Sequence, residues 1–174
     1  MSQCWCRSRG LEPFACTIRG VFRVRSYTAQ NQLIGALRDE ILARLTASTI
    51  EFPSDTLEIC LQSLCETLQQ QRISIDRVAT DGRKLAECIA ETLLKEQGIA
   101  QPKGRLADHT NELRRRGLTA PWIISHLDCL RAFGNEGVHL SDNVTYRPPR
   151  LRDDDLVPIL ASVQRVIAFF ATRD

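Results

Sequence analysis

Apolar residues recur about every 3.6 positions along most of the chain, which is the spacing of one face of an α-helix. The first such face follows Asn31 and predicts a helix of about eighteen residues. Pro53 ends this segment, because the residue before a proline is pushed out of the helical region. The inward positions of the predicted helix are Leu33, Ile34, Leu37, Ile41, Leu42 and Leu45.

Three further helices are predicted in the middle of the chain. Ser54 or Asp55 can cap the second helix, since either side chain can accept a hydrogen bond from a free N–H group of the first turn. The third runs from Asp76 to Gln97 before Gly98, and the short fourth runs from Arg105 to Arg116 before Gly117. Their inward positions are Leu57, Leu61, Leu64, Leu68, Val78, Leu85, Ile89, Leu93, Leu106 and Leu113.

Two more amphipathic segments complete the pattern. Thr119 is expected to cap a fifth helix, with Pro121 in its first turn, where a proline loses no intrahelical hydrogen bond. Aspartates at positions 153 to 155 open the last helix, because acids suit its positive end. Its inward positions are Leu156, Leu160, Val163, Ile167 and Phe170. Only Val21 to Tyr27 hints at a strand, so the sequence predicts an all-α fold, an antiparallel bundle of five to six helices.

The first thirty residues differ from the rest of the chain. They are rich in Arg and Ser, contain one acid and show no sustained helical period, so residues 1–30 are expected to be a poorly ordered extension outside the core. A transit peptide and a start assigned too far upstream are alternatives. Cys4, Cys6 and Cys16 lack the fourth ligand of a usual metal site. Residues 31–174 are then one helical domain, which suits the length of the chain.

Composition narrows the class of protein. With 43% hydrophobic and 25% charged residues the chain is globular, and no apolar run is long enough to cross a bilayer. The net charge of +2 is too small to indicate nucleic-acid binding by itself. Cys60, Cys65, Cys88 and Cys129 lie in helical patterns without paired C-x-x-C spacing, which indicates reduced thiols and a cytoplasmic location.

The segment from Trp122 to His139 has two distinct faces when it is placed on a helical wheel. One face carries the apolar residues together with Gly134 and Gly137, and the other carries polar residues. Each glycine costs about 1 kcal/mol relative to alanine inside a helix. Close approach of a neighbouring helix therefore explains the glycines best, with a break of the helix at Gly134 as the alternative.

Arg131, Asn135 and His139 are spaced i, i+4 and i+8 on the polar face and form what we call the polar ridge. A histidine can move protons near neutral pH and an arginine can hold a phosphate, so the ridge is a candidate active site. Its alternative role is structural, as a hydrogen-bonding ladder in which Arg131 pairs with Asp128 or Glu87.

Other candidate residues give weaker indications. His126 lies on the apolar arc and is expected to be a hydrogen-bonded core residue, whereas His109 is expected at a surface or an interface. The sequence has no metal-ligand spacing and no phosphate-loop or dinucleotide fingerprint, so we expect neither metal nor cofactor. Arg147, Arg150 and Arg152 lie in a basic loop that could contact phosphate or be an ordinary solvated loop.

Over residues 74 to 171 the chain resembles the bacterial domain-of-unknown-function family 4145. The resemblance rests on Arg83-Lys-Leu-Ala-Glu87, on Arg116-Gly-Leu and above all on the pattern R-x-x-G-N-x-x-x-H from Arg131 through Gly134 and Asn135 to His139. That family is similar to the HEPN group of helical bundles and includes relatives fused to restriction-modification subunits. The resemblance implies an all-α bundle, a bacterial cytoplasmic setting with a link to defence, and a homodimer or a partner protein.

Two functions follow as hypotheses. The first is a non-enzymatic module that binds a partner protein, a nucleotide or nucleic acid. The second is a metal-independent endoribonuclease like those of the HEPN group, in which His139 is the general acid or base, Arg131 stabilises the phosphate charge and Asn135 orients the scissile group. Ribonucleases of that group separate Arg and His by four to six residues, whereas seven residues separate Arg131 from His139. This difference favours the binding module.

Overall fold

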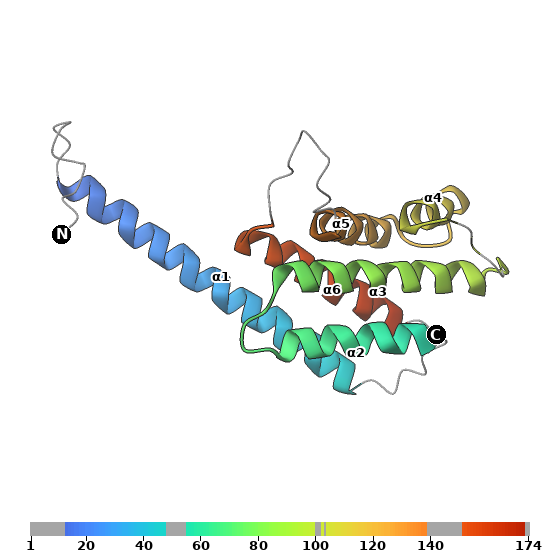
Figure 1. The fold of residues 1–174 in the computed structure, drawn as a ribbon. Helices are drawn as coiled ribbons and strands as arrows, with labels where there is room; N and C mark the ends of the chain where they lie inside the picture. The colour runs from blue at the N-terminus through green and yellow to red at the C-terminus, as the bar shows by residue number, and fades with distance from the viewer. Residues whose placement is uncertain (1–12, 48–54, 100–101, 103, 139–150, 173–174) are drawn as a thin grey trace.

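The computed structural model describes residues 13–47, 55–99, 102, 104–138 and 151–172. Within these residues the chain forms six α-helices and no β-strand, which confirms the all-α fold class. The elements are α1 (Pro13–Ala47), α2 (Asp55–Gln69), α3 (Ile75–Glu96), α4 (Leu106–Arg116), α5 (Pro121–Val138), the 3-10 turn η2 (Asp153–Asp155) and α6 (Leu156–Ala171), as Figure 1 shows.

Helix α3 is central to the bundle and packs against α2, α4, α5 and α6. A small residue on α3 brings two neighbours close, because a β-carbon at Gly82 would lie 3.2 Å from Leu130 Cδ2 of α5 and 3.3 Å from Val163 Cγ2 of α6. The aliphatic residues predicted to face inward on α2, α3, α4 and α6 are buried in one continuous core, which confirms these faces. Each fully buried aliphatic side chain contributes roughly 1.5–3 kcal/mol, so this core is the main source of stability.

Glycines end α3 and α4 as the sequence predicts. Gly98 has φ of 82° and Gly117 has φ of 64°, a left-handed conformation that other residues adopt only with strain. The start of α5 differs from the prediction. Pro121 is its first residue and Ile123 N donates to Ala120 O at 3.0 Å, while the Thr119 hydroxyl is buried without a partner. Thr119 is therefore not the cap, because the helix begins one residue later than a Thr119 cap requires.

Helix α1 begins at Pro13 rather than near Asn31. The strand hinted at between Val21 and Tyr27 is wrong, because these residues are helical. A proline is favoured in the first turn of a helix, and adding residues to an existing helix is far easier than starting a new one. The well-packed half of α1 that follows residue 30 therefore allows a helix to continue through a segment whose own pattern did not indicate one.

Neighbouring helices are antiparallel in two pairs and parallel in a third. Cys60 of α2 meets Cys88 of α3 while Thr67 meets Asp81, so these helices are antiparallel. His126 of α5 contacts Ser162 of α6, and Trp122 of α5 contacts Phe169 of α6, so helices α5 and α6 are antiparallel as well.

Helices α1 and α6 differ from these two pairs. Gln30 Nε2 donates to Asp154 Oδ1 and Gln164 Nε2 donates to Glu40 Oε1, both at 2.8 Å. Residue numbers rise together in this last pair, so α1 and α6 run parallel, which the predicted antiparallel bundle did not include.

Candidate functional site

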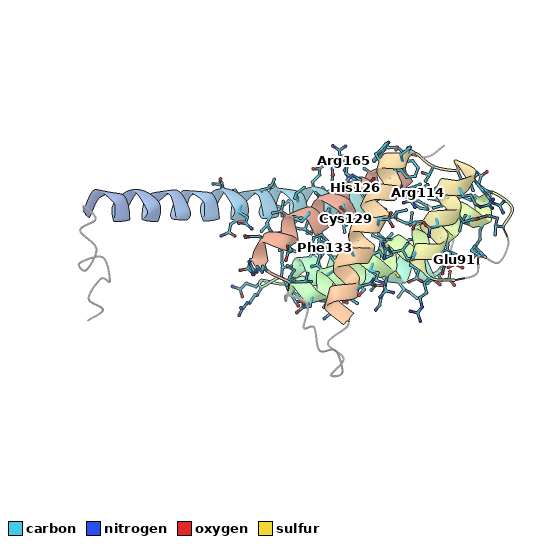
Figure 2. The ribbon with its side chains drawn as sticks, turned by 90° about the horizontal axis from the view of Figure 1, so that it is seen from above. Glu91, Arg114, His126, Cys129, Phe133 and Arg165 are labelled. Carbon is cyan, nitrogen blue, oxygen red and sulfur yellow. The ribbon has the colours of Figure 1, made fainter. Side chains whose placement is uncertain are left out.

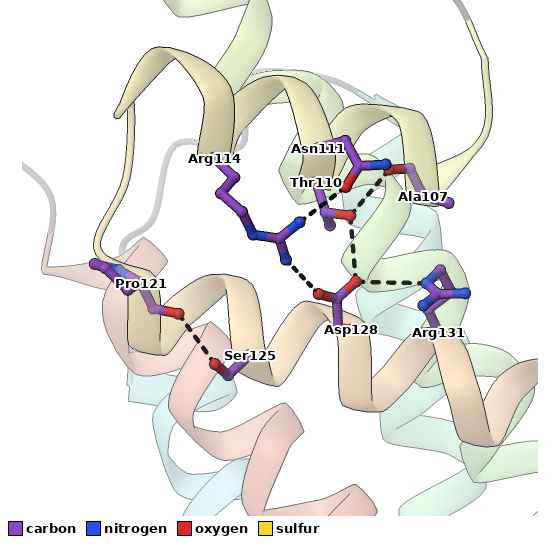
Figure 3. Close-up of polar contacts among 8 residues, drawn as sticks. All are labelled: Ala107, Thr110, Asn111, Arg114, Pro121, Ser125, Asp128 and Arg131. Atoms are coloured by element: carbon purple, nitrogen blue, oxygen red, sulfur yellow. Dashed lines mark hydrogen bonds and ion pairs between the residues drawn. The ribbon is translucent and has the colours of Figure 1, made fainter.

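Asp128 of α5 binds three side chains from α4 and α5. Its Oδ2 accepts a hydrogen bond from Arg114 Nη2 at 2.7 Å, and its Oδ1 accepts from Thr110 Oγ1 at 3.3 Å and from Arg131 Nε at 3.4 Å (Figure 3). Arg114 also donates to Asn111 Oδ1 at 2.8 Å. We call these residues the Asp128 network. Because its contacts cross from one helix to the other, the network fixes α4 against α5.

Arg131 of the polar ridge belongs to the Asp128 network. The sequence offered Asp128 and Glu87 as partners, and the structure selects Asp128, three residues earlier on the same helix. The Arg131 side chain is 35% exposed, so the ion pair contributes about 1 kcal/mol at most. The guanidinium is nevertheless engaged by a carboxylate, which is the interaction expected of a structural ladder.

Gly134 lies at the closest approach between α5 and α3. A β-carbon at Gly134 would be 2.9 Å from the Ala79 carbonyl oxygen and would overlap Arg83 Cβ. Helix α5 continues unbroken through this glycine to Val138. Of the two predicted explanations, close helix packing is therefore confirmed and a break at Gly134 is wrong. Gly137 is also within α5.

Arg83 and Glu87 are one turn apart on α3 but do not form an ion pair with each other among the described side chains. Arg83 lies over Gly134, and its Nε is buried without a hydrogen-bond partner. Glu87 lines a pocket near α2 and α4. The two residues of this weaker motif therefore contact different parts of the fold: Arg83 packs against α5, and Glu87 lines the pocket.

The remaining candidates divide between described and undescribed positions. Asn135 is half-buried near the end of α5. His139, Arg147 and Arg150 lie outside the described residues, so the structure does not place the third member of the polar ridge or most of the basic loop. Arg152 is exposed at the start of η2, where its backbone N donates to Asp155 Oδ2 at 2.8 Å.

His109 of α4 is buried in the bundle, whereas the sequence predicted a surface or an interface. It is 4% exposed rather than at a surface, and neither of its ring nitrogens has a hydrogen-bond partner. It lines a pocket of about 430 Å³ together with Cys60 of α2 and Glu87 and Cys88 of α3. The signal was present in the sequence, because His109 is three residues after Leu106 and four before Leu113 on the apolar face of α4.

His126 of α5 lies at the edge of the core. Its Nδ1 is 3.2 Å from Ser162 Oγ of α6, and Trp122 packs edge-on at a centroid distance of 6.1 Å. Burial lowers the pKa of His126 below its ordinary value of 6.5, and the positive charge of Arg165 lowers it further (Figure 2). The predicted hydrogen bond is confirmed, although the ring is half-buried rather than enclosed.

The described residues lack two features that would indicate a particular kind of site. No three His, Cys, Asp or Glu side chains among them come close enough together to hold a metal ion. None of the helices they form is both long and apolar enough to span a bilayer. Two groups of polar side chains that the structure brings together are the Asp128 network and the residues that line the pocket beside His109.

Comparison with known proteins adds no relative: no protein-family model, curated protein or solved structure matches the chain. The family resemblance carried by Arg131, Gly134, Asn135 and His139 stays a prediction.

Proposed function

We propose that the chain is a non-enzymatic helical interaction module that self-associates through the N-terminal half of α1. The course of this helix is the observation that carries the proposal. Helix α1 is 35 residues long, and Gln30 and Glu40 join its C-terminal half to Asp154 and Gln164. The N-terminal half extends away from the other helices in two perpendicular views (Figures 1 and 2). We call residues 13–29 the arm.

An arm of this length and composition is not expected to be stable alone in water. The arm is only a little longer than the roughly 12 to 15 residues below which isolated helices are marginal even when alanine-rich. The arm contains Thr17, Ile18, Val21 and Val24, which are β-branched, and Gly20, all of which disfavour helix relative to alanine. Continuation from the packed half of α1 allows the arm to be helical, and contact with another molecule would add the stabilisation that its own sequence lacks.

Charge favours a second copy of the chain as that molecule. The arm contains Arg19, Arg23 and Arg25 and no acidic residue. The first thirty residues together carry five arginines and one glutamate, so with an overall charge of +2 the rest of the chain carries a net −2. A basic arm and a weakly acidic remainder of the chain allow two copies to exchange arms in a symmetric dimer.

The polar ridge supports a structural role over RNA cleavage. Arg131 is paired with Asp128, and α5 is continuous through Gly134. A break there was the one local change that could offset the long Arg-to-His spacing. In a regular helix, positions eight residues apart, such as 131 and 139, are separated by about 12 Å along the axis and about 80° around it. This separation is unfavourable for two side chains that must contact the same phosphate.

The family resemblance supports the same proposal. It implies a dimer, a bacterial cytoplasmic setting and an association with restriction or other defence systems. The module would then contribute binding to such a system rather than a chemical step.

The charge argument is tested by neutralising the arm. Sedimentation equilibrium of the full chain should show that Arg19→Gln, Arg23→Gln and Arg25→Gln together weaken self-association at least about tenfold. The matched single variants are Arg23→Gln and Arg72→Gln, because Arg72 is an exposed arginine between α2 and α3. Arg23→Gln should weaken association and Arg72→Gln should leave it unchanged. Equal association by the triple variant and the wild type would contradict the role of the arm.

A further inference from the structure

Two cysteine thiols meet at the wall of the pocket described above. The sulfur atoms of Cys60 on α2 and Cys88 on α3 lie 3.5 Å apart, and both side chains are half-buried. Neither is in a disulfide, in which the sulfur atoms would be about 2.05 Å apart. A movement of roughly 1.5 Å would therefore bring the two sulfur atoms to bonding distance.

The helices that carry these thiols are held together nearby. Asp81 of α3 accepts hydrogen bonds from Thr67 Oγ1 at 2.9 Å and from Ser63 Oγ at 3.3 Å, both on α2. These contacts lie about two turns from the thiol pair along antiparallel helices, so they fix the register that places Cys60 opposite Cys88. The fold thus places Cys60 and Cys88 opposite each other on neighbouring helices.

The pocket gives a small polar molecule access to both thiols. Its volume of about 430 Å³ exceeds that of several water molecules, and Cys60 and Cys88 are both part of its wall. His109 lines the same pocket with two buried ring nitrogens that have no partner in the protein. A buried polar atom without a hydrogen-bond partner lowers the stability of the fold. A polar molecule in the pocket that forms a hydrogen bond with the imidazole would remove this loss.

We propose that Cys60 and Cys88 are a thiol–disulfide exchange site that takes a small-molecule disulfide from the pocket and becomes a bridge between α2 and α3. The Cys60 thiolate attacks one sulfur of the small disulfide, forms a mixed disulfide and releases the first small thiol. Cys88 then loses its proton and attacks Cys60 Sγ, which forms the bridge and releases the second small thiol. Two electrons pass from the protein to the small disulfide, and two protons end on the released thiols.

The environment of Cys88 supports this order of attack. Burial, followed by the hydrogen bond with Cys60 and the nearby carboxylates of Glu91 and Glu87, raises the pKa of Cys88 to about 12. Lys84 and His109 are the other ionisable groups of the pocket wall. Cys88 therefore stays protonated near neutral pH, which is why its attack is placed second.

Oxidised glutathione is the probe for the test. The reduced full chain is incubated with it, remaining thiols are blocked, and tryptic peptides are analysed by mass spectrometry without reduction. Trypsin cuts after Arg72, Arg77 and Arg83, so a bridge joins two separate peptides whose combined mass is lower by two hydrogens. We expect that joined pair from the wild type and from Cys65→Ser, and its absence from Cys60→Ser and Cys88→Ser.

Thermal unfolding gives a second reading that does not depend on any variant being folded. The bridged wild type should melt roughly 5 to 15 °C above the reduced protein, and dithiothreitol should reverse the change. The proposal is overturned if Cys60 and Cys88 remain free thiols or stop at mixed disulfides with glutathione under conditions that oxidise other cysteines of the chain. The reduced and bridged proteins are compared at one protein concentration, because self-association makes the melting temperature depend on concentration.

Discussion

Gly134 of α5 lies directly beneath Arg83 of α3, so close that a β-carbon at position 134 would overlap Arg83 Cβ. The Ala79 carbonyl oxygen would be 2.9 Å from the same β-carbon, and a backbone atom cannot move aside as the end of a side chain can. This relationship explains a glycine inside a continuous helix. It also separates the packing role of Gly134 from the ion pair that Arg131 forms with Asp128.

Replacing Gly134 by alanine should destabilise the fold. The gain of about 1 kcal/mol in helix propensity is outweighed by overpacking, so we expect a net loss of roughly 1–3 kcal/mol in urea unfolding. Gly35→Ala is the matched control, since Gly35 is also helical and nothing lies within 4 Å of its β-carbon position. That variant should gain about 0.5–1 kcal/mol. A Gly134→Ala protein as stable as the wild type would contradict the close approach.

The Asp128 network should show coupling between helices. A double-mutant cycle with Asp128→Ala and Arg114→Ala is expected to give a coupling free energy of about 0.5–1 kcal/mol, reduced in 1 M salt because the pair is partly exposed. A cycle of Asp128→Ala with Arg115→Ala is the control, as Arg115 bonds to Glu112 instead. Equal coupling in both cycles would mean that the Arg114 contact has no specific effect.

His126 should make the protein less stable in acid. Its pKa is lowered in the folded state by burial and then by Arg165, so the folded protein binds the proton less readily than the unfolded chain. The stabilisation is fully present above the unfolded value of 6.5 and is lost as pH falls through the folded pKa. His126→Gln should flatten the decline in unfolding free energy between pH 7 and 5. An unchanged slope would exclude His126 as its source.

RNA cleavage provides the comparison between the two functional hypotheses. With EDTA present, the wild type, His139→Ala and Arg131→Ala should all leave RNA intact, because Arg131 is bound to Asp128 and α5 is unbroken at Gly134. Electrophoresis of labelled RNA after incubation with purified protein is the measurement. Cleavage by the wild type that disappears in His139→Ala would support the ribonuclease hypothesis instead.

The parts of the fold that the sequence predicted are those determined by residues close together in the sequence. Helices α2 to α6 followed from apolar spacing and from Gly98 and Gly117, because helix faces and helix ends are encoded within a few residues. The start of α1 did not, since residues 13–30 are helical by continuation from a packed segment and not by their own pattern. The parallel course of α1 and α6 depends on contacts between residues 124 positions apart, which spacing cannot indicate.

The candidate site shows the same division. The pairing of Arg131 with Asp128 was predictable, because residues three apart share a helix face. The burial of His109 was missed although its register with Leu106 and Leu113 indicated it. The meeting of Cys60 with Cys88 was not predictable, as it requires knowing how two helices align.

The mass of the wild-type chain in solution tests the central claim most directly. Light scattering coupled to size-exclusion chromatography, at micromolar concentration and physiological salt, should give twice the 19.7 kDa of one chain. Raising the salt concentration should shift the protein toward a single chain, because ions screen the attraction between the basic arm and the weakly acidic remainder of the chain. A mass of 19.7 kDa at every protein concentration would contradict self-association and with it the proposed function.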